Sequence, residues 1–333
     1  LYTIVMKNLN KVGIDEFLLL LVGMIVLAYF FPSVGSAEGT FSLKNLADIG
    51  VSVIFLFYGL RLSPEKLKAG LSNWKLHIVI HVFTFIVFPL LILSMRGLFT
   101  GNENEQLWLG IFYLAALPST VSSSVVMVSI AKGNLPAAIF NASISSLLGV
   151  FITPLWIGMV VSGQSGNPEL GHVMLKLVIQ VIIPVIAGIV LHRFLGRFAE
   201  KHKNGLKKFD QAVILTIVYT AFCDSFTEHA FEGFGFGKLL VCSLGMVLLF
   251  FVVYFIINGI SGLLNFNRED KITAAFCGSK KSLVHGTVMS KVLFPNSASL
   301  GIILLPTMLY HAFQLIIVSI IAQRLGKQEV KEN

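Results

Sequence analysis

The stretch FCGSKKSLVHG (276–286) places Lys280 and Lys281 side by side inside an otherwise apolar segment. No acidic residue lies nearby in sequence to neutralise them. Gly278 can end one helix, and Ser279 or Ser282 can cap the helix that follows. The stretch therefore predicts a helix interrupted near its middle, with two cations at the interruption.

The composition places this helix in a membrane. Hydrophobic residues make up 55% of the 333-residue chain and charged residues only 13%, with a mean hydropathy of +0.83. Soluble domains carry about 25% charged residues. We therefore expect an all-α polytopic membrane protein, with the lipid bilayer as its main partner. The cysteines Cys223, Cys242 and Cys277 have neither disulfide nor metal-ligand spacing and are interpreted as small buried residues.

Apolar runs predict ten transmembrane helices, because the length allows about ten spans of about 20 residues. A cleavable signal sequence over the first run is the alternative, and it would leave nine spans. The predicted spans are 15–32, 45–62, 74–95, 106–131, 134–161, 170–192, 207–226, 238–263, 270–292 and 297–323.

The basic residues indicate the orientation. With both ends in the cytoplasm of a cell-membrane protein, the inward loops carry 18 of the 25 basic residues, whereas the outward loops are acidic around Glu103 and Glu228. The run 192–210 is then an orientation signal beside anionic lipid, and no nucleic-acid partner is expected despite the net charge of +8. The inward basic residues are Lys7, Lys11, Arg61, Lys66, Lys68, Lys75, Lys132, Arg193, Arg197, Lys201, Lys203, Lys207, Lys208, Arg268, Lys271, Arg324, Lys327 and Lys331.

A second interruption, ALPSTVSSS (116–124), lies in the fourth span. Pro118 removes a backbone donor, and Ser119 or Thr120 can cap a second half-helix. Each interrupted span is followed by a turn containing Asn and by a long span with an internal proline (154 and 306). Two five-helix halves in inverted relation, each with one broken helix, are typical of a secondary transporter. Ordinary kinks are the alternative.

Five stretches in both halves carry a resemblance to a known family. The chain resembles the bile acid:sodium symporter (SBF) superfamily, and within it the SBF-like branch. The stretches are LFYGLRLSPEKL (56–67), LPSTVSSSVVMVSIAKGNLPAA (117–138), SLLGVFITPL (146–155), FCGSKKSL (276–283) and LPTMLYHAFQL (305–315).

The resemblance implies a 5+5 inverted repeat with a core domain, in which the two broken helices cross at the midplane, and a panel domain, with the transport site between the two domains. The panel would comprise 1–73 (helices 1–2) and 164–230 (helices 6–7). The core would comprise 74–163 (helices 3–5) and 231–325 (helices 8–10), with 326–333 as a cytoplasmic tail. No enzyme activity and no cofactor are expected.

Sodium coupling does not carry over with the resemblance. Sodium-coupled members have a Glu and a Gln where this chain has Phe276 and Lys280, and an ammonium group cannot coordinate a hard cation. Three interpretations of Lys280 remain open: it replaces the missing cation against half-helix carbonyls, it binds an anionic substrate, or it carries a proton. Lys281 is expected to cap the first half-helix or to face a polar neighbour.

Polar residues in the apolar spans complete the candidate substrate or ion site, with interhelical hydrogen bonding as the alternative for each. His77 and His81 have metal-ligand spacing but lack a third ligand, so no metal is expected. The candidates are Pro118, Ser119, Thr120, Ser122, Ser123, Ser124, Asn141, Ser145, Ser146, Gly278, Ser279, Lys280, Lys281, Ser282, His285, His311 and Gln314, with Tyr310 beside them.

The sequence thus favours a secondary carrier working by alternating access on a small or amphipathic organic anion. A proton-coupled antiporter is an alternative. So is a membrane regulator, since the resemblance connects SBF-like relatives with calcium homeostasis. An intramembrane hydrolase would use Ser279 or Ser282 beside Lys280 as a Ser–Lys dyad, with His285 as a base. The oligomeric state is not predicted.

Overall fold

The computed structural model describes residues 16–37, 42–61, 73–99, 102–162, 175, 178–232, 234–295 and 297–332. These residues form helices and connecting turns, with no β-strand among them. The helices are α2 (Glu16–Phe30), α3 (Pro32–Ser36), α4 (Leu43–Arg61), α6 (Trp74–Val82), η1 (Phe83–Val87), α7 (Phe88–Ser94), η2 (Arg96–Leu98), α8 (Asn102–Ala116), α9 (Ser122–Ile130), α10 (Leu135–Ser162), η3 (Val178–Ile182), α12 (Ile183–Lys201), α13 (Lys203–Thr227), α14 (Phe236–Leu263), α15 (Arg268–Gly278), α16 (Leu283–Leu293) and α17 (Leu300–Glu332).

Within the described ranges, seven helices are long and apolar enough to cross a membrane. Val241, Leu244 and Leu248 form an exposed apolar stripe along α14, which is stable against lipid and not against water. The predicted all-α polytopic membrane class is therefore confirmed. The other three predicted spans contain shorter helices: α2 has 15 residues, and two spans are broken into α8–α9 and α15–α16. The ten-span inverted repeat stays a prediction.

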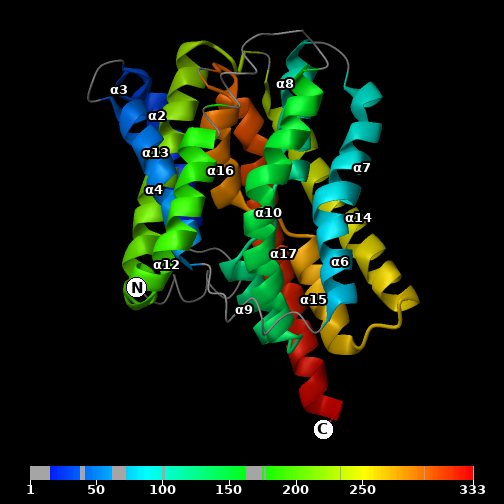
Figure 1. Cartoon of the computed structure of the whole chain (residues 1–333). Helices are drawn as coiled ribbons and strands as arrows, with labels where there is room; N and C mark the ends of the chain where they lie inside the picture. Colours follow the sequence, from blue (N-terminus) through cyan, green and yellow to red (C-terminus); the bar gives the residue numbers. More distant parts are fainter. Residues whose placement is uncertain are drawn as a thin grey trace, which may run out of the picture.

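The helices pack in two groups (Figure 1). The first helix group comprises α2, α3, α4, α12 and α13, and the second comprises α6 to α10 and α14 to α17. In the first group α4 lies directly on α12, where a side chain at Gly59 or Gly188 would collide with the facing backbone. In the second group Asp270 accepts hydrogen bonds from Asn73 and Asn134, which ties the start of α15 to the starts of α6 and α10.

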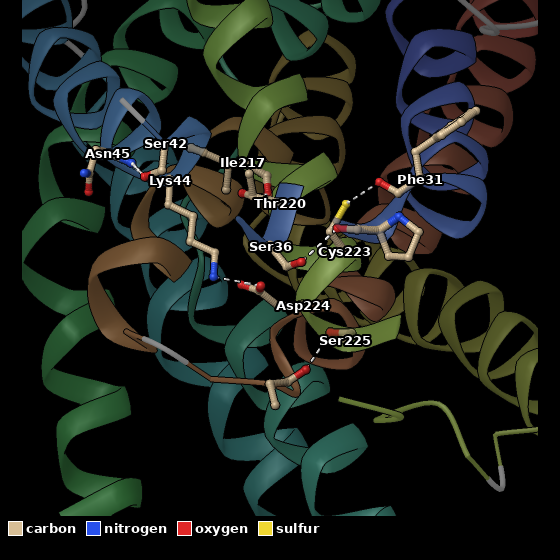
Figure 2. Close-up of polar contacts among 12 residues, drawn as sticks. Phe31, Ser36, Ser42, Lys44, Asn45, Ile217, Thr220, Cys223, Asp224 and Ser225 are labelled. Carbon is tan, nitrogen blue, oxygen red and sulfur yellow. Dashed lines mark hydrogen bonds and ion pairs between the residues drawn. The ribbon is translucent and has the colours of Figure 1, made fainter. Parts of the chain in front are cut away.

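Polar contacts hold α3 and α4 on α13 at one end of the first group (Figure 2). Lys44 pairs with Asp224 at 2.8 Å, and the Tyr219 hydroxyl donates to the Phe31 carbonyl at 2.8 Å. At the same end Ser225 reaches the second group, since its hydroxyl donates to the Ala298 carbonyl at 2.7 Å and accepts from the Gly301 amide at 3.0 Å. The two groups are thus hydrogen-bonded to each other at this end.

Two predicted boundaries were wrong because apolar runs mark the lipid-facing part of a helix and not its end. The run 192–210 is almost entirely helical: α12 continues to Lys201 and α13 begins at Lys203, with only His202 between them. Similarly, α17 continues to Glu332, beyond the predicted end at 323. Four of the inward basic residues, Lys7, Lys11, Lys66 and Lys68, lie outside the described residues.

The third predicted span is one continuous helical segment with a π turn inside it. Residues Phe83–Val87 form η1 between α6 and α7, and the Phe88 amide donates to the Phe83 carbonyl, five residues back. The next amide in this register would belong to residue 89, which is a proline and has no N–H. The carbonyl of Thr84 is therefore left without a helical donor.

Candidate functional site

The two interrupted spans meet at their interruptions. Figure 1 places α8 and α16 toward one end of the molecule and α9 and α15 toward the other, so the broken spans run in opposite directions. The Ser282 amide donates to the Pro118 carbonyl at 2.9 Å, and the Ser119 hydroxyl donates to the Cys277 carbonyl at 2.6 Å. The interruptions predicted at 116–124 and 277–282 are both present.

The first interruption follows from Pro118. A helix continuing past Ala116 would need an amide at position 118 to bond the Leu114 carbonyl, and proline has none. The Leu117 amide bonds Leu114 instead, and the Thr153 hydroxyl on α10 donates to the Ala116 carbonyl at 2.8 Å. Donors from outside α8 therefore satisfy its last carbonyls.

The prediction that Ser119 or Thr120 caps the second half-helix was wrong. The N-cap residue of α9 is Val121, and no side chain caps this end. Ser119 bonds across to Cys277 instead, while Thr120 pairs with the Ser124 hydroxyl at 2.7 Å. Ser119 therefore bonds the neighbouring broken helix, and Thr120 bonds a serine one turn later. The N-terminus of α9 is left without a side-chain cap.

The second interruption follows its prediction more closely. Gly278 is the last residue of α15, and Ser282 is the N-cap of α16, with its hydroxyl accepting from the His285 amide at 3.3 Å. Ser279 does not cap α16, because its hydroxyl donates back to the Ala275 carbonyl at 2.6 Å. The Tyr310 hydroxyl donates to the Ser279 carbonyl at 2.6 Å.

The ammonium of Lys281 is surrounded by backbone carbonyls. It donates to the carbonyls of Thr84 at 2.7 Å, Ala115 at 2.5 Å and Leu117 at 2.9 Å, and it lies 4.2 Å from the centre of the Phe88 ring. The side chain is 1% exposed. Two of the carbonyls belong to the C-terminus of α8, the negative end of its dipole, and the third is freed by the π turn. Lys281 therefore caps the first half of the opposite broken helix.

Gln314 on α17 holds the backbone of Lys281. Its side-chain carbonyl accepts from the Lys281 amide at 2.8 Å, and its NH₂ group donates to the Lys281 carbonyl at 2.8 Å. The His311 Nδ1 lies 2.9 Å from the Gln314 Nε2. This two-bond clamp, which the sequence did not indicate, fixes a non-helical residue between two half-helices.

The side chain of Lys280 points toward the start of α9. Its side chain is fully buried, and its ammonium donates to the Ser123 hydroxyl at 2.8 Å, in the first turn of α9. Within the described part of the chain, no carboxylate lies within ion-pair distance of Lys280 or Lys281. Neither ammonium bonds Ser279 or Ser282 there, so the Ser–Lys dyad of the hydrolase alternative is not formed.

The remaining candidates lie around the interruptions in different roles. The Ser145 hydroxyl accepts from the Ser119 amide at 2.9 Å, whereas Asn141 and Ser146 bond carbonyls of their own helix. Ser122 is exposed at the start of α9. The ring of His285 stacks on Tyr58 at 4.6 Å, where α16 meets the first helix group.

Tyr58, Thr84 and Thr153 were missed by the sequence analysis, since each acts through a tertiary contact with no local signal. His77 and His81 do not belong to any group of metal-binding side chains among the described residues.

Comparisons with known proteins identify the family. Residues 15–327 match the SBF-like CPA transporter family. The chain belongs to this family. A Pseudomonas aeruginosa relative, uncharacterized protein PA2026, is 37% identical over 314 residues to this SBF-like transporter, covering 94% of this chain and 93% of the relative.

Two vertebrate relatives are named sodium/bile acid cotransporter 7. The protein from Rattus norvegicus is 32% identical over 324 residues, covering 95% of this chain and 94% of its own length. That from Danio rerio is 31% identical over 327 residues, covering 95% of each. The resemblance found in the sequence is confirmed, and the chain is a multi-pass membrane transporter of the SBF-like family.

Proposed function

We propose that this SBF-like transporter is a secondary carrier for an organic anion, and that Lys280 and the start of α9 bind the anion. The observation that carries the proposal is the place of the Lys280 ammonium. It is fully buried, bonds Ser123 in the first turn of α9, and has no carboxylate partner in the described ranges.

The electrostatics of this place favour an anion. The N-terminus of a helix carries a partial positive charge, and α9 has no side-chain cap to offset it. A buried ammonium beside that terminus adds a second positive charge, and a charge at the bilayer centre costs about 2.5–3.5 kcal/mol or more. An anion bound there would neutralise both, accepting from the ammonium and from the first amides of the helix.

Access to Lys280 would come from the α9 side. Val121 is 37% exposed and Ser122 is exposed, whereas Lys280 itself is not. A carboxylate, sulfate or sulfonate group would reach the ammonium past Ser122 and Ser123, with its apolar part beside Val121. The names of the vertebrate relatives support an amphipathic anion related to bile acids, and a small anion fits the same polar groups.

Coupling to sodium at this position is not part of the proposal. Lys280 and Phe276 stand where the family resemblance puts sodium ligands, and both are fully buried. Neither side chain offers an oxygen to a hard cation. The proposed site therefore works with a fixed positive charge, whatever ion drives the transport cycle.

Alternating access would use the two helix groups. We assign the first helix group to the panel, 1–73 and 164–230, and the second to the core, 74–163 and 231–325. The anion site lies at the interruptions within the core, and movement of one group against the other would expose it to either side. The antiparallel broken spans support the inverted repeat.

The proposed location is the cell membrane, with the site's α9–α15 end toward the cytoplasm. Lys201, Lys203 and Arg268 lie at helix ends that share the inward side of the predicted topology, and Glu228 and Glu232 lie on the opposite side of that topology. Both chain ends would then be cytoplasmic.

Thermal unfolding of the purified protein tests the anion site. Taurocholate, succinate and sulfate are added separately, each as sodium and as choline salts, to wild type, Lys280→Met and Lys207→Met. Lys207 is an exposed lysine on α13 and serves as the control. A ligand at about 100 times its Kd stabilises by about 2.7 kcal/mol, which raises Tm by about 5–10 °C.

We expect at least one anion to raise the Tm of wild type and Lys207→Met equally in both salts, and not that of Lys280→Met. Stabilisation by sodium alone, retained in Lys280→Met, would contradict the proposal. An anion that binds through Lys280 but is not taken up by proteoliposomes would instead favour the regulator alternative.

A further inference from the structure

The three carbonyls around Lys281 form a shell that supplies one acceptor to each N–H group of its ammonium. An ammonium has three N–H groups, and each finds one backbone oxygen at 2.5–2.9 Å. None of the three oxygens belongs to a side chain. The ring of Phe88 covers a further side, with its centre 4.2 Å from the nitrogen.

These carbonyls are available because two helices lack donors at this point. Pro89 and the π turn free the Thr84 carbonyl, while Pro118 ends α8 and leaves the carbonyls of Ala115 and Leu117 without helical donors at its C-terminus. Unwound backbone carbonyls at the C-terminal end of a half-helix are the groups that coordinate monovalent cations in broken-helix carriers. The chemistry of the shell is therefore that of an alkali-ion site.

We propose that this shell is a monovalent-cation site that the protein fills with its own Lys281 side chain. The ammonium acts as a tethered cation, which keeps the crossing of the broken helices neutral without a free ion from either side of the membrane. Without the side chain, the same carbonyls would bind free ammonium, potassium or sodium. The proposal does not rest on the anion site at Lys280.

The position of the lysine is fixed independently of its charge. Gln314 bonds the backbone amide and carbonyl of Lys281, so these two hydrogen bonds remain when the side chain is shortened. Truncation to alanine then leaves space next to three unpaired carbonyls, whereas methionine fills the space of the aliphatic stem without supplying a donor. Lys281→Ala therefore tests whether the emptied site binds a free cation, whereas Lys281→Met shows the effect of losing the hydrogen bonds alone.

The test is thermal unfolding of purified Lys281→Ala, Lys281→Met and wild type in chloride salts of equal ionic strength. The cations are choline, sodium, potassium, ammonium and methylammonium. We expect wild type to have the same Tm in all five. Lys281→Ala should unfold about 5 °C or more below wild type in choline and regain about half of that loss in at least one small cation. Lys281→Met should show the loss without the recovery.

Lys280→Ala is the matched control, because its ammonium bonds a hydroxyl and no backbone carbonyl. We expect its Tm not to depend on the cation. If the Tm of Lys281→Ala depends on the cation no more than the Tm of wild type does, the proposal is overturned. Water filling the vacated space would give this result.

Lys281→Gln covers the case in which Lys281→Ala does not fold. It keeps N–H donors near the carbonyls but carries no charge, so its Tm in choline should also fall by about 5 °C or more. A Lys281→Gln protein as stable as wild type would show that hydrogen bonds to the carbonyls stabilise the interruption without a charge. It would overturn the proposal that Lys281 acts as a tethered cation.

Discussion

Two adjacent lysines have separate surroundings because the chain between α15 and α16 is not helical. On a regular helix, neighbouring side chains point about 100° apart. In the interruption the backbone is not helical, and Gln314 holds the amide and carbonyl of Lys281, so this constraint does not apply to the two side chains. Lys281 reaches the carbonyls at the C-terminus of α8, and Lys280 reaches the N-terminus of α9. The charge of Lys281 therefore lies at the negative end of a helix dipole, which favours it, and the charge of Lys280 lies at a positive end, which does not.

The clamp on Lys281 gives a prediction at the residue scale. Gln314→Leu removes both hydrogen bonds and leaves a buried amide and a buried carbonyl unpaired, each costing about 1–3 kcal/mol. We expect the Tm of the purified protein to fall by about 5 °C or more.

Gln323→Leu is the control, because Gln323 lies nearer the end of the same helix and is only partly buried. It should shift Tm by at most about 2 °C. Equal effects of the two substitutions would show that the clamp does not stabilise the interruption.

Sequence signals located the two broken helices but not how their ends are satisfied. Pro118 and Gly278 mark the ends of α8 and α15 because proline and glycine act on the local backbone. Ser282 was recognised as a cap for the same local reason. The bonds of Ser119, Thr153 and Tyr310, by contrast, reach carbonyls of other helices. Such contacts depend on tertiary packing, which the local pattern of a single sequence does not specify.

The packing of α10 against the first interruption gives a prediction at the element scale. A Cβ at Gly149 would lie 2.6–2.9 Å from three ring atoms of Pro118, which cannot rotate away. Gly149→Ala should therefore displace the interruption and lower Tm by about 2–8 °C, even though alanine favours helix.

Gly245→Ala in α14 is the matched control, because a Cβ there meets no atom within 4 Å. It should leave Tm unchanged or raise it slightly. A Gly149→Ala protein as stable as Gly245→Ala would mean that the interruption tolerates movement of Pro118.

At the scale of the whole molecule, the two helix groups are linked most directly where α13 meets the start of α17. Ser225 bonds both Ala298 and Gly301, and Figure 2 shows Ser225 close to the Lys44–Asp224 pair that holds α4 on α13. If the groups move in transport as proposed, this conformation is closed at the Ser225 end, a property that no local sequence pattern encodes.

A double-mutant cycle at this contact tests the closure. A Cβ at Gly301 would lie 2.8 Å from the Ser225 hydroxyl and 3.1 Å from its Cβ, so Gly301→Ala should separate α13 from α17. We expect a loss of about 1–3 kcal/mol and faster hydrogen exchange in 223–232 and 298–303. In the Ser225→Ala background the hydroxyl is absent, so the same substitution should cost less, by about 0.5–1 kcal/mol. Strictly additive effects, with exchange unchanged in both segments, would show that this contact does not hold the two groups together.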